Sequence, residues 1–443
     1  MSHTLAQSMP SSLTQLLCAF RPCFTSRGFD TFTTLVTGLI AAPARRTVCG
    51  MLTASRMNGV WHHSRAHRFF ACARWSPDQL GLTLLGLVIG WLLPAGAPVT
   101  VAVDDTLFRR RGRKVHAACW AYDGSRQVAA GQQKLSRGNT FVVAAIVVTL
   151  PFLDRPIALP VLARLWRPGG PTKTVLARDL ISLIARARRD RVIHVVADGA
   201  YVCKTLRHLP ANATLTGPLP RNAALWEIHP DLDDPPCMRG RRGRPSVRGA
   251  KIGTPDQLTT TPGKTVTLTR YGRVAEVTIH EHRCLWYGVF RSQPVRVILV
   301  REPRRPGLAL VTTDTHTAAD QIVKRYASRW AIEVAFSDAK HITGVGEARN
   351  RTQCAVERTV PFGLQVQTLV VVWYHLAGHS PKVISEHRDR ARWYTTKTHP
   401  SYHDMIVKLR RVLIAAQYRA DPALAPTPEQ IQAIRLAWAD TAA

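Results

Sequence analysis

Three carboxylates stand where the chain could bring them together for metal chemistry. Asp105 ends the run VTVAVDD (99–105), Asp198 ends RVIHVVAD (191–198), and Glu333 lies on a predicted helix. Hard oxygen ligands with no His or Cys close by in sequence suit Mg²⁺ or Mn²⁺ better than zinc. Two such ions about 3.5–4 Å apart can activate a water or a 3′-hydroxyl in phosphodiester chemistry. A lone Asp at a strand end is usually a turn former or a helix cap, so this prediction rests on the three acids jointly.

Glu333 shares its helical face with three other polar side chains. In YASRWAIEVAFSDAK (326–340), about 100° of turn per residue places four polar groups within an arc of roughly 60°: Tyr326, Arg329, Glu333 and Lys340. Apolar side chains flank this stripe on both sides: Ile332, Phe336, Trp330 and Val334. The opposite side carries small or polar residues, which are better suited to water. The stripe is therefore predicted to face inward, where ionisable groups are costly unless they have a function or partners.

The surrounding elements predict a mixed sheet with helices on its faces. The strand-like runs are 99–105, 113–124, 141–150 and 191–198, and helical spacing recurs at 172–190. The last strand is either ATLT (213–216) or LALVTT (308–313). In a sheet of this order the first and fourth strands can lie side by side. That arrangement brings Asp105 and Asp198 together, and a helix over the sheet can add Glu333.

The charge balance predicts a nucleic-acid partner. Sixty Lys and Arg residues against 29 Asp and Glu give a net charge of +31. The charge is spread along the chain and not set on one amphipathic helix, which argues against a membrane surface. Neutralised phosphates release counterions and give affinity without reading sequence. The nine cysteines contain no C-x-x-C pair, so neither a zinc site nor a disulfide framework is indicated, and a reducing cytoplasm fits.

The chain resembles DDE transposases of bacterial insertion sequences, in particular the hairpin-forming, cut-and-paste group with the signature Y-x2-R-x3-E-x6-K. The match holds at all four positions: Tyr326, Arg329, Glu333 and Lys340. VDDT (103–106) matches the first-acid motif, an Asp before Thr after an apolar strand, and ADGAY (197–201) resembles the second-acid motif. The resemblance covers about residues 99–345.

This resemblance implies an RNase H-like fold with helices on both faces of a mixed sheet and a metal-binding catalytic triad of Asp105, Asp198 and Glu333. Asp104 is the competing first acid, because adjacent strand residues point to opposite faces and only one can face Glu333. The motif match favours Asp105. The expected parts are a basic helical DNA-binding domain (1–97), two catalytic segments (98–215 and 308–345), a β-rich insertion between them (216–307), and a helical C-terminal region (346–443).

The resemblance also implies DNA contacts beside the triad. Arg329 and Lys340 would hold phosphates, Arg329 in a bidentate grip, and Tyr326 would contact the strand end. In the family's hairpin mechanism a flipped base stacks on an aromatic side chain of the insertion. Trp286 is the candidate and Trp226 a weaker one, and a core position within the insertion is the alternative for Trp286.

Two arginine-rich runs are further predicted phosphate contacts, because runs this one-signed in so basic a chain are typical of DNA-binding loops. RRRGRK (109–114) contains Arg110 and Arg111, and RGRRGR (239–244) contains Arg241 and Arg242.

Together these inferences predict a DNA transposase that cleaves element ends and joins them to target DNA by two-metal-ion chemistry, through a hairpin intermediate. Mg²⁺, with Mn²⁺ as a substitute, is the expected cofactor. A homodimer or higher assembly on double-stranded DNA, in the bacterial cytoplasm on nucleoid DNA, is expected with it. The alternatives are an RNase H-like nuclease without strand transfer and a non-catalytic DNA-binding regulator. A regulator has no need for acids that repel phosphate.

Overall fold

The structure, a computed structural model, describes residues 9–429 except 130, 230–247, 261–262, 271, 391–392, 394 and 420–426, together with residues 431–432.

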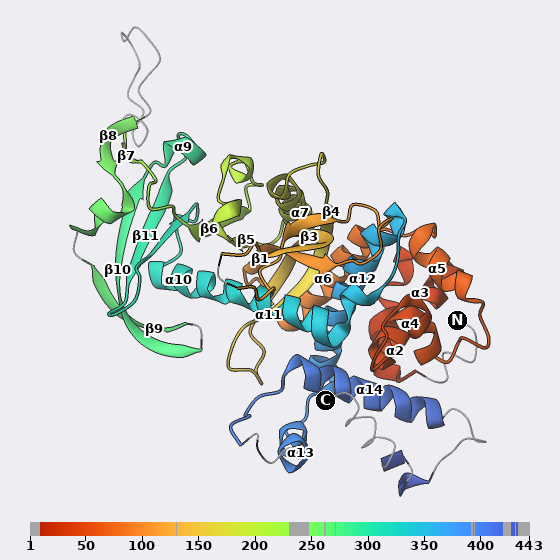
Figure 1. The fold of residues 1–443 in the computed structure, drawn as a ribbon. Coiled ribbons are helices and arrows are strands. Elements are labelled where there is room, and N and C mark those ends of the chain that lie inside the picture. The colour runs from red at the N-terminus through yellow and green to blue at the C-terminus, as the bar shows by residue number, and fades with distance from the viewer. Residues whose placement is uncertain are drawn as a thin grey trace.

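A mixed sheet forms the centre of the molecule (Figure 1). Five strands form its core: β1 (Val99–Arg109), β3 (Leu135–Val148), β4 (Ile157–Trp166), β5 (Ile193–Ala197) and β6 (Ala213–Pro218). They lie in the order β4-β3-β1-β5-β6, with β3 antiparallel to β1 and β4, and with β5 parallel to β1 and β6. This is the strand order of an RNase H-like fold, so the predicted fold class is confirmed.

The sheet continues beyond β6. β12 (Leu308–Thr312) pairs with β6, followed by β11 (Val295–Arg301), β10 (Arg273–Cys284) and β9 (Lys264–Arg270). Both alternatives for the last strand are therefore strands of this sheet, as β6 and β12. β7 (Leu225–Ile228) and β8 (Arg248–Gly253) form a separate two-stranded sheet. At the opposite edge β2 (Cys119–Tyr122) pairs with β3 and covers only part of the strand expected at 113–124.

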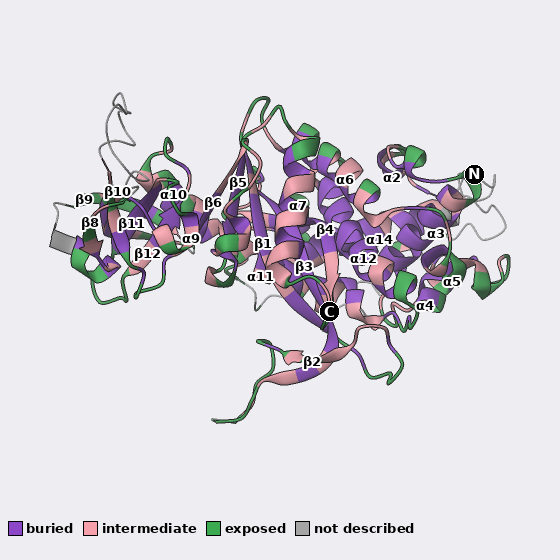
Figure 2. Cartoon of the chain, turned by 90° about the horizontal axis from the view of Figure 1, so that it is seen from above, coloured by how far each residue is buried: buried purple, intermediate pink, exposed green. Residues whose placement is uncertain are grey.

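The central strands are buried on both faces, as their sequences require. β1 begins VTVAV and β5 reads IHVVA, runs rich in β-branched residues that favour buried strands. Figure 2 shows β1, β3 and β5 largely buried between helices. Val101 and Val103 of β1 belong to the core cluster that contains α6 (Pro77–Leu92) and α7 (Lys173–Ala187). Ala102 packs instead with Ile332 on the opposite face of the sheet.

The predicted helix at 326–340 is helical throughout but changes type along its length. α10 (Ala319–Ala327) is followed by the 3₁₀ turn η5 (Ser328–Trp330), α11 (Ala331–Asp338) and the π turn η6 (Ala339–Thr343). α11 packs against β4 and β1.

The polar stripe on this helix is buried along one flank only. Ile332 and Phe336 are buried, whereas Trp330 and Val334 are exposed. The expectation of apolar ridges buried on both sides is therefore wrong for the second ridge, which borders a cavity described below.

Helices from the two ends of the chain pack together beside the sheet. They are α2 (Ser11–Cys18), α3 (Ser26–Ala41), α4 (Val48–Ala54), α5 (His63–Ala71), α12 (Gln353–Trp373) and α14 (Tyr402–Arg419). The short helix α13 (Lys382–Arg390) lies between α12 and α14 in the chain. Arg410 of α14 is buried and donates to the Ile40 carbonyl at 2.6 Å, which joins the two ends of the chain.

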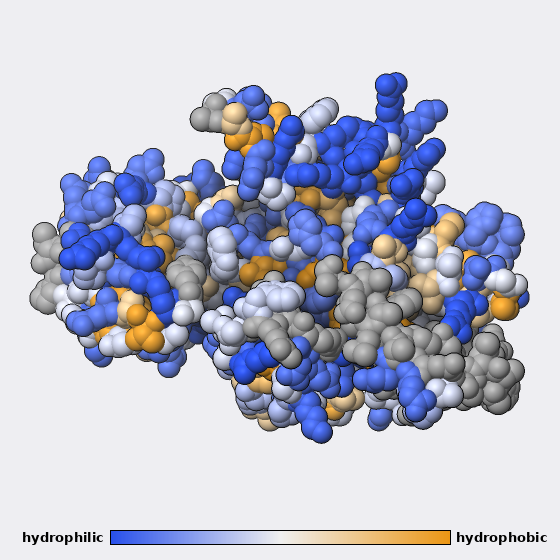
Figure 3. Space-filling view, turned by 60° about the horizontal axis from the view of Figure 1, so that its bottom comes forward, coloured by the Kyte–Doolittle hydropathy of each residue, from blue (hydrophilic) through white to orange (hydrophobic). Residues whose placement is uncertain are grey.

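One helical stretch of the described chain, Gln353–Gly378, is long and apolar enough to cross a membrane by length and composition. It comprises α12 and the π turn η8 (Tyr374–Gly378), and 83% of its most apolar window is buried inside the protein, as in a core helix. In Figure 3 hydrophilic side chains cover most of the visible face, with only small hydrophobic patches between them. This surface fits a chain of high positive charge.

Candidate active site

The adjacent acids Asp104 and Asp105 leave β1 on opposite faces of the sheet. Their antiparallel partners on β3 are Val143 and Val142, which belong to different core clusters. Asp104 lies on the face covered by α11, where its Oδ2 accepts a hydrogen bond from Arg329 Nη1 at 3.2 Å. The expectation that Asp105 is the acid facing Glu333 is therefore not what the structure shows, because a one-residue step along a strand reverses the face.

Asp105 is held on the other face by two donors that the sequence analysis did not identify. Lys173 Nζ lies 2.6 Å from Asp105 Oδ2, and the Tyr201 hydroxyl donates to Oδ1 at 2.9 Å. Lys173 is the first residue of α7, and Tyr201 ends the 3₁₀ turn η2 (Gly199–Tyr201). Burial, together with the charge of Asp105, raises the pKa of Tyr201 above its ordinary value, so the phenol stays protonated and remains a donor. The ADGAY motif that points to Asp198 contained the signal for Tyr201.

Asp198 comes into register with Asp104 through the parallel pairing of β1 and β5. Val103 is paired with Ala197, and each acid is the next residue along its strand. The prediction that the first and fourth strands lie side by side is confirmed, although β1 continues to Arg109, beyond the end of β5 at Ala197. Burial raises the pKa of Asp104 to about 6, and the negative charges of Asp105 and Asp198 add to this effect. The Asp105 backbone N–H and Arg329 oppose the rise but do not cancel it.

Arg329 links Asp104 to Glu333. Its Nη2 donates to Glu333 Oε1 at 3.1 Å while Nη1 contacts Asp104, and the guanidinium is largely shielded from solvent. Burial acts to lower the pKa of Arg329, but the surrounding Tyr326, Asp104 and Glu333 outweigh it and raise that pKa. In this arrangement Arg329 is the cation that neutralises two of the acids.

The acidic side chains are of the type that binds Mg²⁺, but their oxygens do not converge on one point. Among the residues that the structure describes, no three His, Cys, Asp or Glu side chains are arranged to hold a metal ion. The carboxylates nonetheless fit a hard divalent cation in type, and the repulsion acting on Asp104 is what such a cation relieves. The residues fit the ion, provided that Arg329 gives up its ion pairs.

The two ends of the polar stripe are less accessible than the sequence predicted. Tyr326 is buried and packs in the cluster formed with β10, β11 and β12, so it is not presented to a DNA strand in this arrangement. Lys340, in η6, places its Nζ 5.8 Å from the centre of the Phe108 ring. Burial lowers the pKa of Lys340, an effect that Asp123 opposes.

Two predicted DNA contacts are buried in this structure. Arg110 is only 7% exposed, and its guanidinium donates to Asn139 Oδ1 at 3.1 Å, to the Gly346 carbonyl at 3.0 Å and to the Ala348 carbonyl, so it joins β1 to a distant loop. Trp286 is 8% exposed and packs in the main core, with its ring 6.0 Å from that of Phe290. The alternative of a core position for Trp286 is what the structure shows.

The remaining predicted contacts stay predictions. Arg111 is exposed. Trp226 is partly exposed, and the Arg248 guanidinium lies 4.7 Å from its ring centre. Arg241 and Arg242 lie outside the described residues.

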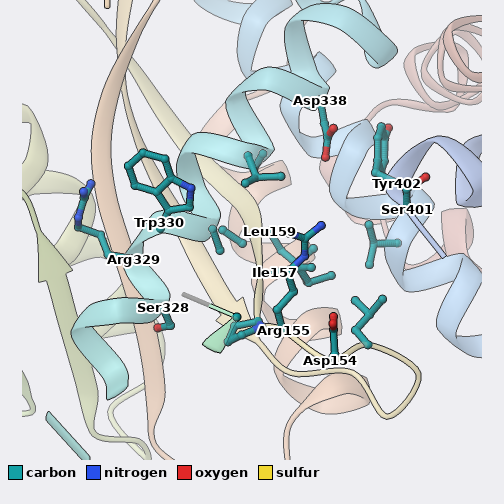
Figure 4. Close-up of a pocket in the computed structure, with 18 of the residues that line it drawn as sticks. Asp154, Arg155, Ile157, Leu159, Ser328, Arg329, Trp330, Asp338, Ser401 and Tyr402 are labelled. Carbon is teal, nitrogen blue, oxygen red and sulfur yellow. The ribbon is translucent and has the colours of Figure 1, made fainter. Parts of the chain in front are cut away.

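A cavity of ≈ 720 Å³ borders α11 and separates it from the start of α14 (Figure 4). Trp330, Val334 and Asp338 line it from the helix, and Ser401 and Tyr402 line it from the C-terminal region. Burial raises the pKa of Asp338 to about 6. In Figure 4 Arg329 lies at one edge of the cavity, with Trp330 between it and Asp338.

Comparison with known proteins identifies a family. The sequence model described as "DDE superfamily endonuclease" matches residues 19–287, more than half of the chain. This segment contains Asp104, Asp105 and Asp198 and ends before Glu333. No curated protein sequence matches the chain. A cryo-EM structure of the piggyBac transposase synaptic complex with hairpin DNA matches with a TM-score of 0.40 and 10% identity, over 99% of this chain and 83% of that one. A likeness this distant carries no argument.

Proposed function

We propose that this chain, which belongs to the DDE superfamily of endonucleases, is a transposase that cuts DNA at the ends of a mobile element and joins those ends to target DNA. One observation carries the proposal. The parallel strands β1 and β5 place Asp104 and Asp198 one residue beyond the paired Val103 and Ala197. The helix α11, packed over β1, adds Glu333, which shares Arg329 with Asp104. Acids brought together from three distant segments in a chain of charge +31 have DNA phosphodiesters as their natural substrate.

The metal-binding role is assigned to Asp104, Asp198 and Glu333, with Asp105 as the alternative first acid that the sequence motif favours. Asp104 is preferred because it shares Arg329 with Glu333, whereas Asp105 is already neutralised by Lys173. Mg²⁺, or Mn²⁺ in its place, would supply Lewis-acid stabilisation and a nucleophilic water or 3′-hydroxyl at these oxygens.

Arg329 has two tasks in this proposal. Without DNA it holds Asp104 and Glu333 and offsets their charge in a partly buried site. Once the acids have another cation, its planar fork is free to hold a phosphate with two parallel hydrogen bonds. Lys340, seven residues beyond Glu333 on the same face, extends the phosphate-binding line.

The proposal also includes a route through a hairpin intermediate, which the Y-x2-R-x3-E-x6-K signature supports. Trp226 is the better placed of the two candidate aromatics for a flipped base, because its ring is partly exposed while Trp286 is buried. Assembly as a dimer or larger complex on DNA, and action on bacterial nucleoid DNA, belong to the same proposal.

The second candidate, a nuclease that uses the same acids without strand transfer, is separated from the first by its products. The test incubates the purified chain with Mg²⁺, labelled DNA from the flanks of its own gene and a supercoiled target plasmid. Wild type is compared with Glu333→Gln and with Glu357→Gln, a matched change on α12, where Glu357 Oε1 accepts a hydrogen bond from Gln353 Nε2 at 3.1 Å on an exposed face. Cleaved and joined products that disappear in Glu333→Gln alone, while DNA binding persists, support the transposase.

Cleavage without joining supports the nuclease. Equal activity in Glu333→Gln removes Glu333 from the reaction, and binding without cleavage in every variant supports the regulator.

A further inference from the structure

A basic projection extends from the edge of the sheet beyond the acids. We call residues 109–137 the arm; it contains β2, the start of β3 and their connections, and residue 130 lies outside the described residues. Figure 2 shows β2 and its loops extending away from the body of the molecule. The arm contains eight Lys and Arg residues and a single acid, Asp123. Its composition fits a polyanionic partner.

The arm displays two large aromatic side chains to solvent. Trp120 is 67% exposed and Tyr122 is 70% exposed, and both lie on β2, the edge strand. Residues two apart on a strand point to the same face, and their Cα atoms lie about 6.6–6.8 Å apart. Stacked nucleotides repeat at about 3.4 Å along a strand, so this separation leaves room for one base between the two rings.

The arm is ordered at its base, which fixes the direction of these rings. Asp123 accepts from Arg109 Nε at 2.8 Å and from Ser125 Oγ at 2.6 Å, and its N–H donates to the Lys134 carbonyl at 2.7 Å. Although burial acts to raise it, these hydrogen bonds lower the pKa of Asp123 to about 2. The single acid of the arm is therefore neutralised internally and does not repel phosphate. Arg137 donates to the Gly112 and Arg113 carbonyls and holds the neighbouring basic loop.

The base of the arm adjoins the polar stripe at Lys340. The charges of Asp123 and Arg109 both act on Lys340, and Phe108 lies under its ammonium. Arg109 is five residues beyond Asp104 on β1, or about 16 Å along an extended strand. A DNA strand that leaves the acids along Lys340 reaches the arm within a few nucleotides.

We propose that the arm holds unpaired DNA beside the active site, with one base stacked between Trp120 and Tyr122 and the neighbouring phosphates on Arg111, Arg113 and Lys114. Aromatic rings set among cations are the usual platform for single strands, because every base has a face to stack. A protein partner, or a second copy of this chain, fits less well, since two arms in contact would repel each other. The proposal adds a binding site to the proposed function and does not depend on cleavage.

The test measures binding of a fluorescein-labelled 15-nucleotide oligo-dT to the full chain in EDTA at several salt concentrations. The double variant Trp120→Ala/Tyr122→Ala is compared with wild type and with Trp91→Ala, which removes a 57% exposed tryptophan from α6. Loss of base stacking is expected to weaken binding by roughly tenfold or more, and the salt dependence should stay unchanged because no charge is lost. Trp91→Ala should bind as wild type does.

Photocrosslinking locates the contact independently. An oligonucleotide with one 5-iododeoxyuridine should crosslink to the peptide that contains residues 119–122, and the double variant should lose this product. Unchanged oligo-dT affinity in the double variant would overturn the proposal, as would an equal loss in Trp91→Ala. A changed sedimentation coefficient with unchanged DNA affinity would assign the rings to a protein interface. The two proposals can fail separately. If the double variant binds oligo-dT as wild type does but wild type cleaves DNA, only this inference fails. If wild type binds oligo-dT through the arm but cleaves no DNA, this inference stands and the proposed function fails.

Discussion

Asp314 and Asp104, one buried and one half-buried carboxylate at strands of the same sheet, each pair with an arginine of one helical stretch, yet their surroundings differ. Asp314, directly after β12 and the residue Thr313, accepts from Arg325 Nη1 at 2.8 Å, from Thr317 Oγ1 at 2.6 Å and from the backbone N–H groups of His316 and Thr317, both at 3.1 Å. Asp104 accepts from the Asp105 N–H at 2.8 Å and from Arg329 at 3.2 Å. A carboxylate can accept about four hydrogen bonds, so Asp314 is satisfied and Asp104 is not.

The electrostatics follow the same division. Burial acts to raise the pKa of Asp314, but the hydrogen bonds from Arg325 and Thr317 outweigh it and hold that pKa well below its usual range. Asp104 has its pKa raised to about 6 by burial and by neighbouring acids. The comparison teaches that an Arg–Asp pair alone does not mark function. A buried acid left short of donors and close to other acids is the better indicator of a site that receives a cation or substrate.

The largest difference is expected in stability. Asp314→Asn leaves Arg325 buried beside a neutral amide, and breaking a buried pair costs about 3–5 kcal/mol in the free energy of unfolding. Asp104→Asn removes a carboxylate that is itself unfavourable to bury, so it should cost less than about 1 kcal/mol. Urea unfolding of both variants measures these losses in unfolding free energy. Equal losses would contradict the difference drawn between the two acids.

The contributions of the two acids to stability should depend on pH in opposite directions. Asp104 has a raised pKa, so its favourable contribution is complete below about pH 4 and is lost as the pH rises through about 6. The unfolding free energy of wild type relative to Asp104→Asn should therefore fall by up to about 3 kcal/mol between about pH 4 and pH 7.

Asp314 has a lowered pKa, so its contribution is present above about pH 4 and is lost only as the pH falls below that value. The difference between wild type and Asp314→Asn should be flat where the Asp104 difference changes. These curves are to be measured without divalent ions, and two parallel curves would contradict the assignment.

Conservative changes of the two arginines should sharpen the comparison. Arg325 donates to Asp314 and to Thr317 Oγ1 through separate nitrogens, and a lysine cannot reproduce this fork. Arg325→Lys is expected to cost about 1–2 kcal/mol in unfolding free energy and to leave DNA cleavage unchanged once the protein is folded. Arg329→Lys should instead preserve stability and lower cleavage. A loss of stability in Arg329→Lys as large as in Arg325→Lys would place both arginines in the structural class.

The smallest effect is expected from Tyr201→Phe. The change removes one donor from Asp105 and should cost about 1 kcal/mol in unfolding free energy, with Lys173 still in place. Because Asp105 lies on the face away from Glu333, the cleavage rate should stay within a few fold of wild type. A large loss of cleavage in this folded variant would bring Asp105 into the reaction.

Much of this arrangement was predictable from local sequence patterns. Strand-like runs and their order indicated that Asp198 would lie beside the acids of β1, and the helical period placed Arg329 and Glu333 on one face. These features depend on neighbouring residues in the chain, where periodicity is informative.

The structure departs from the expectations where contacts between distant segments decide the outcome. Arg110 belongs to a typical DNA-binding run, but the carbonyls of Gly346 and Ala348 fold back onto it from more than 230 residues away. Asp104 and Asp105 differ by one residue, and only the pairing of β1 with β3 decides which of them faces α11. Val334 follows the apolar period of its helix but borders a cavity, which the sequence of that helix alone does not predict.

The most direct test of the account compares metal-dependent DNA cleavage by Asp104→Asn and Asp105→Asn, with folding of both variants verified by circular dichroism. Since Asp104 faces Glu333 and Asp105 is held by Lys173 and Tyr201, Asp104→Asn should lose cleavage by at least about 10²-fold. Asp105→Asn should stay within about tenfold of wild type, less than that loss. Cleavage retained in Asp104→Asn and abolished in Asp105→Asn would contradict the account and restore the acid that the sequence motif favours.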